Sequence, residues 1–252
     1  MKIKYICLLT LLLCSRHFLY AQTDTNEVYI AKDFTNYTSF LQFGVGNNVP
    51  IGAYGSSKHP FRSSFATSAL SRGFCVSALY SQKVKQRYGF EVGATFIRNG
   101  NKWRDFEEAY QKKIGGTATI GIFLYEHLSL YGGANYNISN KEFLFTASIG
   151  LGALYTKNLG EYGVNISTSG TNYSGGSMYI PNSIMPMFYG SVSLKYYLSN
   201  EFFIVGNCDF IYSLYRIEVT ERKGWDIPEA TYLKRNLTIT NLAFTIGLGT
   251  LF

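Results

Sequence analysis

Histidine supplies the general base in many hydrolases, and this chain of 252 residues contains three histidines. His17 lies in the amino-terminal leader described below, and His127 lies in a predicted short turn. His59, in a stretch rich in Gly, Ser and Pro, stands where a lipid-modifying site could form, but the serines near it are ordinary loop residues. No cluster of His, Cys and carboxylates has the spacing of metal ligands. We therefore predict no catalytic residues, no metal and no cofactor.

Charged residues inside the apolar segments are more informative than the histidines. Three charged side chains fall on the polar face of segments in which apolar and polar residues alternate. If these segments are strands whose polar faces line the narrow interior of a barrel, an unpaired charge there is costly. We therefore expect these charges to pair with one another or with amide side chains on the same face. Such a cluster fits a polar plug that stabilises a closed barrel; the alternative is the lining of a narrow water-filled pore. The predicted polar cluster consists of Glu91, Lys195, Asp209, Gln42, Asn135 and Asn207.

The segment from 237 to 252 shows this alternation most clearly. One face carries Leu242, Phe244, Ile246, Leu248 and Phe252, whereas the other carries Asn241, Ala243, Thr245, Gly247 and Gly249. A strand of period two with one apolar and one small or polar face separates lipid from a polar interior. A transmembrane barrel pairs its last strand with its first, because an open sheet edge cannot stay unpaired in hydrocarbon. The pattern therefore predicts an all-β fold, a single antiparallel transmembrane barrel.

Similar alternation recurs along the chain and sets the expected number of strands. An even number of strands is required if short turns lie on the periplasmic side, long loops lie outside and both termini lie inside. We count about ten strands. Eight is the alternative if 161–167 and another weak segment are loop. Glu126 and His127 form one of the expected short turns. Four strand ends each carry a pair of residues whose second member is tyrosine, and we predict that these pairs lie at one depth, at the membrane interface. They are 79–80, 124–125, 154–155 and 196–197. The expected strands are about 37–46, 72–81, 87–97, 115–125, 128–138, 142–155, 161–167, 187–198, 201–215 and 237–252.

The amino terminus has the pattern of a secretory leader. Lys2 and Lys4 precede an apolar run over 5–14, and we expect cleavage after Ala21. Lipidation at Cys14 is the alternative, although Leu13 stands where a small residue is preferred. We thus expect residues 1–21 to be a signal peptide, 22–36 a short periplasmic arm and 37–252 the barrel. Loss of Lys2, Lys4 and Arg16 with the leader lowers the net charge from +7 to +4, and this mild excess is spread over loops, which argues against a nucleic-acid partner.

Two of the 4 cysteines belong to the leader, and the other two could form a disulfide in an oxidising compartment. Strand parity, however, puts Cys75 on the polar face and Cys208 on the apolar face. We predict two free, buried thiols.

The strand that runs into 48–52, the glycine-spaced aromatic strands and the terminal strand 245–252 resemble the bacterial outer-membrane β-barrel domain family of small porin-like proteins. The resemblance covers essentially the whole chain after the leader. It implies location in the outer membrane, contact with outer-membrane lipid and lipopolysaccharide, and a terminal sorting signal for the barrel-assembly machinery. That signal would comprise Phe252, Leu248 and Ile246, and Thr250 departs from the apolar residue usual at its position.

The long loops combine aromatic and charged residues, which suits contact with lipopolysaccharide or a protein partner. The alternative is that they are solvated and variable, as barrel loops commonly are. We expect a non-enzymatic structural or surface-interaction protein, with a small diffusion channel as the second hypothesis and a lipid-modifying enzyme as the third. The loop candidates are Trp103, Arg104, Trp225 and Lys223.

Overall fold

The computed structural model divides the chain into two units, residues 1–31 and residues 32–252. All residues whose structure is described lie in the second unit. The predicted signal peptide and residues 22–33 of the predicted arm therefore lie outside the described part. The described residues are 34–51, 70–101, 108, 111, 117–120, 125–158, 164–168, 171–175, 178–179, 182–199, 201–214, 217–223 and 231–252.

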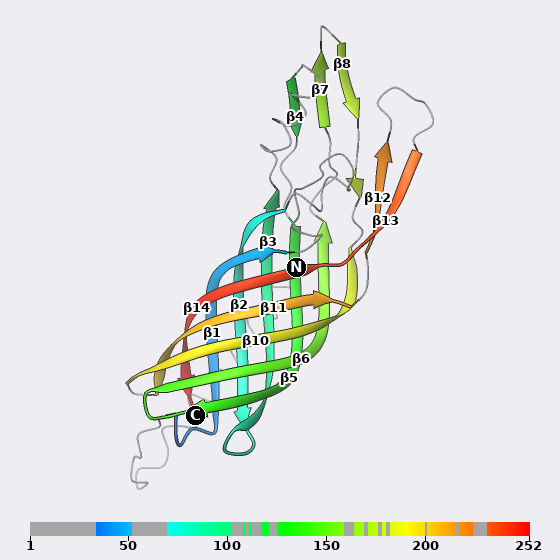
Figure 1. Ribbon diagram of the computed structural model, residues 1–252. Coiled ribbons are helices and arrows are strands. Elements are labelled where there is room, and N and C mark those ends of the chain that lie inside the picture. Colours follow the sequence, from blue (N-terminus) through cyan, green and yellow to red (C-terminus); the bar gives the residue numbers. More distant parts are fainter. Residues whose placement is uncertain are drawn as a thin grey trace, which may run out of the picture. The chain divides into compact units, whose positions relative to one another are not determined.

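Eight antiparallel strands close into a barrel, in the order β1-β14-β11-β10-β6-β5-β3-β2 (Figure 1). The first and last strands close it, since β1 pairs with β14 from Phe40 opposite Leu251 to Pro50 opposite Asn241. The prediction of about ten strands is wrong, and the alternative of eight is confirmed. The barrel strands are β1 (Ser39–Pro50), β2 (Leu70–Lys83), β3 (Tyr88–Asn101), β5 (Tyr125–Ser139), β6 (Phe143–Asn158), β10 (Ser183–Ser199), β11 (Phe202–Ser213) and β14 (Thr240–Leu251).

The two surplus strands of the prediction belong to connections between barrel strands. Within 115–125, β4 (Thr117–Ile120) pairs with β7 (Val164–Thr168), and β7 pairs with β8 (Thr171–Gly175), so these strands form a three-stranded sheet of their own. Alternation alone could not exclude them from the barrel, because a short strand in a connection has the same period of two as a strand in the wall.

A second small sheet joins the connection between β6 and β10 to the connection between β11 and β14. Its order is β13-β12-β9, made of β9 (Met178–Tyr179), β12 (Ile217–Lys223) and β13 (Thr231–Leu237). The predicted charged loop between the last two barrel strands therefore contains a hairpin, in which Ile217 lies opposite Leu237. Within residues 103–112, only Glu108 and Gln111 are described, and both are helical.

The two ends of the barrel differ in the length of their connections. At the turn end, short turns join β2 to β3, β5 to β6 and β10 to β11, and the chain ends there beside the start of β1. The backbone nitrogen of Thr38 donates to the carbonyl oxygen of Phe252 at 2.9 Å, and Phe252 N donates to Ser39 O at 2.8 Å. At the loop end, long connections join β1 to β2, β3 to β5, β6 to β10 and β11 to β14.

This arrangement corrects two predictions about depth. The predicted short turn at Glu126 and His127 lies inside β5, where His127 is opposite Ile97 and Thr156 near the loop end. Tyr155 lies close to that same end of β6, whereas Tyr80 and Tyr196 lie near the turn end. A common level for all four predicted pairs is therefore wrong, because a short polar interruption inside a strand has the same sequence pattern as a short turn.

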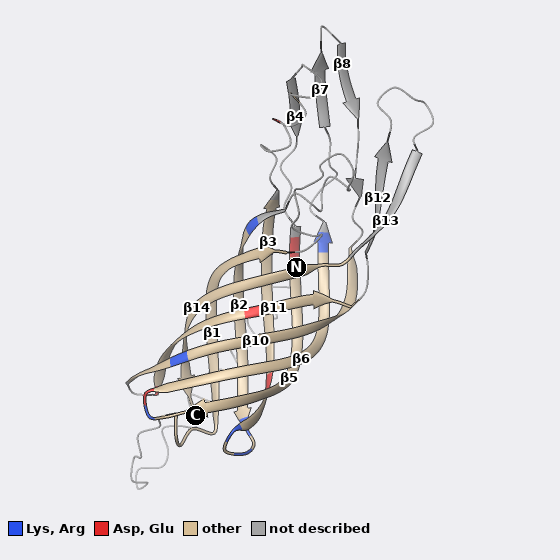
Figure 2. Cartoon of the chain, in the orientation of Figure 1, with Lys and Arg blue, Asp and Glu red and all other residues tan. Residues whose placement is uncertain are grey.

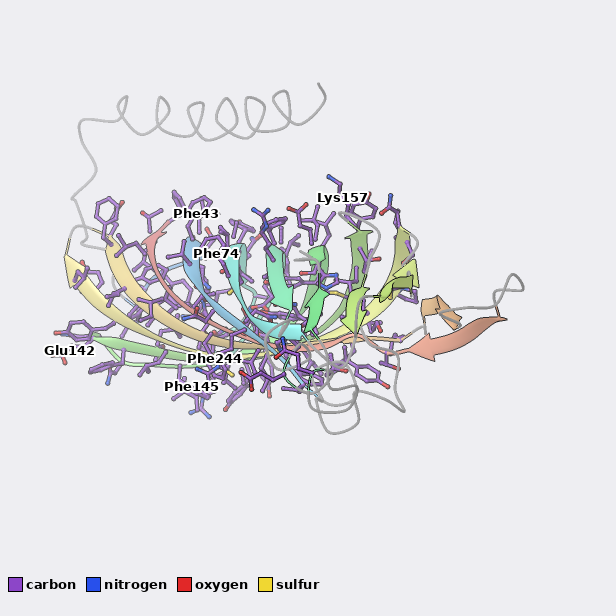
Figure 3. The ribbon with its side chains drawn as sticks, turned by 90° about the horizontal axis from the view of Figure 1, so that it is seen from above. Phe43, Phe74, Glu142, Phe145, Lys157 and Phe244 are labelled. Carbon is purple, nitrogen blue, oxygen red and sulfur yellow. The ribbon has the colours of Figure 1, made fainter. Side chains whose placement is uncertain are left out.

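Side chains of the barrel strands alternate between its interior and its outer surface. On β14, Ile246 and Leu248 are 68% and 59% exposed on the outside, whereas Asn241 and Thr245 are buried. Figure 3 shows Phe43 and Phe145 projecting from the outer side of the wall. The two faces predicted for the terminal strand are confirmed. In the described part of the chain, no helix has the length and apolar character needed to span a membrane.

Candidate functional site: the barrel interior

Charged residues are sparse along the barrel wall and gather near the strand ends (Figure 2). Three of them point inward, and the alternation of their strands places them there: Glu91 on β3, Lys195 on β10 and Asp209 on β11. Glu91 and Asp209 are 2% exposed and Lys195 is 0% exposed. The amide residues of the predicted polar cluster are also buried, at Gln42, Asn135 and Asn207.

Glu91 is held by neutral donors. Ser148 Oγ donates to Glu91 Oε2 at 2.8 Å, and Asn135 Nδ2 lies 3.4 Å from the same oxygen. Asn135 Nδ2 also donates to Ser81 Oγ at 2.8 Å. Glu91 Oε1 has no hydrogen-bond partner among the described residues. One carboxylate oxygen is thus satisfied by residues of β5 and β6, across from its own strand.

Lys195 donates to hydroxyl groups. Its Nζ lies 2.6 Å from Ser193 Oγ and 3.0 Å from Thr146 Oγ1. Thr146 donates to Asn137 Oδ1 at 2.9 Å, and Asn137 Nδ2 donates to Asn135 Oδ1 at 2.7 Å. A continuous series of hydrogen bonds therefore links the ammonium group to the residues that hold Glu91.

Asp209 forms the third part of the polar interior. Ser191 Oγ and Tyr189 Oη donate to Asp209 Oδ1 at 2.6 and 3.1 Å. Beside it, Asn207 Nδ2 donates to Thr245 Oγ1 at 3.0 Å, and Gln42 Nε2 donates to Asn207 Oδ1 at 3.3 Å.

The interior charges form no ion pair with one another in the described part of the chain; an ion pair joins Arg98 and Glu126, outside the interior. We expected the interior charges to pair with one another or with amides. In the structure, both amides and hydroxyls are the partners of the charged groups. Lys195 and Asp209 do not face each other across β10 and β11, because Lys195 lies opposite Val205 and Asp209 lies opposite Ser191, farther along the same pair of strands. Serine and threonine had not been predicted as partners, although they alternate on the same inward face of β6 and β10.

An aromatic cluster closes the interior at the turn end. We call Phe34, Tyr37, Phe40 and Phe203 the aromatic stopper; all four are buried. The ring centroid of Phe203 lies 5.7 Å from that of Phe34 and 5.7 Å from that of Phe40, and Tyr37 lies 5.9 Å from Phe40. Lys195 Nζ sits 4.6 Å from the centroid of Phe40, so the polar network rests directly on the stopper.

Phe34 was missed by sequence analysis, which assigned 22–36 to a periplasmic arm. Residues 34–36 form a turn immediately before β1, and the turn carries Phe34 into the barrel opening. The signal for this contact was a large aromatic side chain shortly before the first strand. Its partner on β11 is far away in sequence, so local pattern could not identify it.

Large side chains also fill the middle of the barrel. Tyr131 and Tyr189 stack with ring centroids 3.7 Å apart and an interplanar angle of 17°. Gly93 makes room for this pair, since a Cβ at that position would lie 2.4 Å from Tyr131 Cζ. Toward the loop end, Asn48 Nδ2 donates to Asn99 Oδ1 at 2.8 Å and to Asn241 Oδ1 at 3.0 Å. The interior is therefore occupied from the turn end to the loop end.

The remaining predicted site residues lie elsewhere. Ile246, Leu248 and Phe252 face outward on and after the last strand. Trp103, Arg104, Trp225 and His59 lie outside the described residues, and Lys223 is the last residue of β12. No group of three potential metal ligands occurs among the residues the structure describes.

The two cysteines among the described residues, Cys75 and Cys208, are both free. Cys75 is buried in the interior, as predicted. Cys208 is only partly buried on the outer surface, so the prediction that it is buried fails in that respect. Their strands put the two thiols on opposite faces of the wall.

Known proteins resemble this chain in structure only. No family model matches it, and no curated protein matches it. Among solved structures, it is similar to the outer membrane protein OprG from Pseudomonas aeruginosa, with 11% identity, 88% of this chain and 99% of that chain covered, and a TM-score of 0.48. It is also similar to a major outer membrane protein from Thermus thermophilus, with 12% identity, coverage of 84% and 99%, and a TM-score of 0.42. For Ail of Yersinia pestis in complex with a heparin analogue, the identity is 13%, the coverage 86% and 99%, and the TM-score 0.40.

Proposed function

We propose that this protein is an integral outer-membrane β-barrel with a sealed lumen, which acts as a non-enzymatic anchor for the connections at its loop end. The observation that carries the proposal is the filled interior, closed by the aromatic stopper and the polar network above it. Export by the leader and insertion through the terminal strand, with Ile246, Leu248 and Phe252 as sorting signal, belong to the same proposal.

The outer surface supports insertion into a membrane. Its described strands carry exposed apolar side chains around the whole barrel, for example Val45 on β1, Val92 on β3, Ile149 on β6 and Leu194 on β10. In water such a surface would be unfavourable by roughly 25 cal/mol for each Å² of apolar area, whereas hydrocarbon accommodates it without that cost. Closure of β1 on β14 also leaves no sheet edge to meet lipid.

The interior argues against a diffusion channel. A water-filled pore would expose inward side chains, yet Lys195, Phe203 and Tyr189 are each at most 2% exposed. Eight strands make a barrel just wide enough for side chains to fill it. An ion would have to displace both the stopper and the hydrogen bonds of Lys195 to cross.

The connections support a role at the loop end. Two sheets link three of the four long connections: β4 comes from the connection between β3 and β5, and β7, β8 and β9 come from that between β6 and β10. The hairpin of β12 and β13 comes from that between β11 and β14. Ordered strands contributed by several connections can present a defined surface to a partner, with Trp103, Arg104, Trp225 and Lys223 as the candidates for contact.

Conductance measurements in a planar bilayer test whether the lumen is sealed. They use purified protein whose folding is verified by the change in its gel mobility on heating. We expect no ohmic current from correctly folded protein, and an inserted fraction verified by protease protection serves as the control. Steady single-channel steps in the wild-type protein would contradict the proposal and would favour the pore hypothesis.

A further inference from the structure

The turn between β2 and β3 carries three cations close together. Lys83, Lys85 and Arg87 alternate with Val84 and Gln86 there, and Figure 2 shows blue on this turn at the turn end of the barrel. Lys85 and Arg87 are exposed, and Lys83 is half-buried. We call Lys83, Lys85 and Arg87 the basic turn.

No acidic side chain compensates the basic turn in the described part of the chain. Lys83 Nζ lies 3.4 Å from the carbonyl oxygen of Thr35 and 4.8 Å from the centroid of the Tyr37 ring. Arg87 donates to the hydroxyl oxygen of Tyr136 at 3.2 Å. The Lys85 side chain has no partner among the described residues. Because every partner is neutral, the turn keeps three positive charges.

The backbone of the turn adds hydrogen-bond donors to these charges. Tyr88 N donates to Lys85 O at 3.3 Å, whereas the nitrogens of Val84 and Lys85 donate to Tyr88 O at 2.9 and 3.0 Å. The N–H groups of Gln86 and Arg87, in the middle of the turn, donate to no backbone carbonyl of the described residues. Successive backbone N–H groups in a turn favour an anion. The turn thus combines two free amide donors with the cations beside them.

The basic turn borders the apolar belt. The Tyr136 ring, whose hydroxyl holds Arg87, lies 5.4 Å from the Tyr88 ring. Tyr88, Phe90 and Val92 then follow one another on the outer face of β3, and all three are exposed. Tyrosines and long basic side chains are typical of the level at which acyl chains give way to head groups. Arg87 therefore lies at head-group level on the outer wall.

The other short turns at this end lack such an excess of cations. Lys141 adjoins Glu142 in the turn between β5 and β6, and the turn between β10 and β11 has Glu201 and no cation among its described residues. A general requirement for cations at the turn end would place them on every turn. Their concentration between β2 and β3 instead indicates one side that meets an anion.

We propose that the basic turn binds the phosphate group of an anionic phospholipid; the proposal rests on the membrane location proposed above. Arg87 can donate two parallel hydrogen bonds to a phosphate, and the two lysines add charge without that geometry. Short turns of outer-membrane barrels lie on the periplasmic side, so the lipid belongs to the periplasmic leaflet and is a phospholipid rather than lipopolysaccharide.

Native mass spectrometry of barrels released from mixed micelles of phosphatidylglycerol and phosphatidylcholine tests this site. The turn variant combines Lys85→Gln and Arg87→Gln and leaves Lys83 in place. The control variant combines Lys141→Gln and Lys157→Gln, which removes the same charge from exposed residues outside the basic turn. Because each basic residue near a membrane surface changes anionic lipid binding by about fivefold, we expect at least a tenfold loss of phosphatidylglycerol preference in the turn variant. The control should change less than twofold, because neither residue belongs to the site.

A variant that keeps the charge separates phosphate recognition from general attraction. Arg87→Lys retains the positive charge but not the two parallel donors, so it should lose about two- to fivefold of the phosphatidylglycerol preference. Equal changes in the turn and control variants would show that net charge alone attracts the lipid and would overturn the proposal. A wild-type preference in Arg87→Lys would also overturn it, because Arg87 would then make no specific contact with the phosphate.

Failure of this inference is distinguishable from failure of the proposed function. If only the inference fails, every variant still folds in phosphatidylcholine vesicles, shows heat-modifiable gel mobility and retains phosphatidylcholine adducts. If the chain is not a membrane barrel, neither lipid is retained and no variant inserts.

Discussion

Phe34→Ala should weaken the barrel at its turn end. The Phe34 side chain is fully buried, although it precedes the first strand, and its ring contacts Phe203, Tyr197 and Tyr37 at centroid distances of 5.7, 6.2 and 6.4 Å. The substitution removes a ring that joins the turn of residues 34–36 to β10 and β11. Phe40, whose ring lies 4.6 Å from Lys195 Nζ and packs on Phe203, would remain.

The size of the effect follows from burial and from how freely the site can collapse. Replacing a buried Phe by Ala costs about 3–5 kcal/mol in protein interiors. We expect a value near the lower end, about 3 kcal/mol, because the turn of 34–36 lies at the edge of the barrel and can move into part of the space. That value corresponds to a decrease in the folding equilibrium constant of roughly a hundredfold, at about 1.4 kcal/mol per factor of ten.

Equilibrium unfolding in urea, in phospholipid vesicles, measures this free energy through heat-modifiable gel mobility. The dependence of the free energy on urea should stay unchanged, so that a shifted midpoint reports stability. Val84→Ala is the control, because Val84 is 65% exposed in a turn at the same end, and it should change stability by no more than about 0.5 kcal/mol. A Phe34→Ala protein as stable as this control would refute the stopper as a structural element.

Three further predictions concern the stopper and the polar interior. Gly249→Ala places a Cβ 2.1 Å from the Phe203 ring of the stopper and 2.7 Å from a backbone oxygen. It should lower the free energy of unfolding in urea by about 1–3 kcal/mol. Gly206→Ala is the control and should not destabilise the protein, because no atom lies within 4 Å of its added Cβ. Ser191→Ala removes the 2.6 Å donor to Asp209 and should cost about 1–3 kcal/mol in the same assay; an unchanged midpoint would contradict that hydrogen bond's role. Burial raises the pKa of Tyr37 from 10.0 to about 12. The Tyr37 hydroxyl therefore ionises at lower pH in the unfolded chain, so the stability present below pH 10 should fall between pH 10 and 12. In a pH series of unfolding midpoints, Tyr37→Phe should lack this part of the decrease. Identical profiles for the two proteins would refute the prediction.

The comparison of prediction and structure separates local from non-local information. Period-two alternation assigned Glu91, Lys195 and Asp209 to the inward face, because successive side chains of any strand point to opposite sides. Alternation could not decide which strands form the wall. The strand β4 and the segment that contains β7 looked like wall strands, and only pairing with each other, rather than with barrel neighbours, distinguishes them.

The sequence by itself determined the class of fold, the two faces of each wall strand and the residues that point inward, since these follow from backbone geometry within a single strand. The tertiary structure decided the number of wall strands and the partners of each inward group. It brought Ser191 to Asp209, and it brought Phe34 to a ring on β11 that is distant in sequence. Such contacts depend on the register between strands and on closure of the barrel, which are properties of the whole sheet and are not encoded in any one segment.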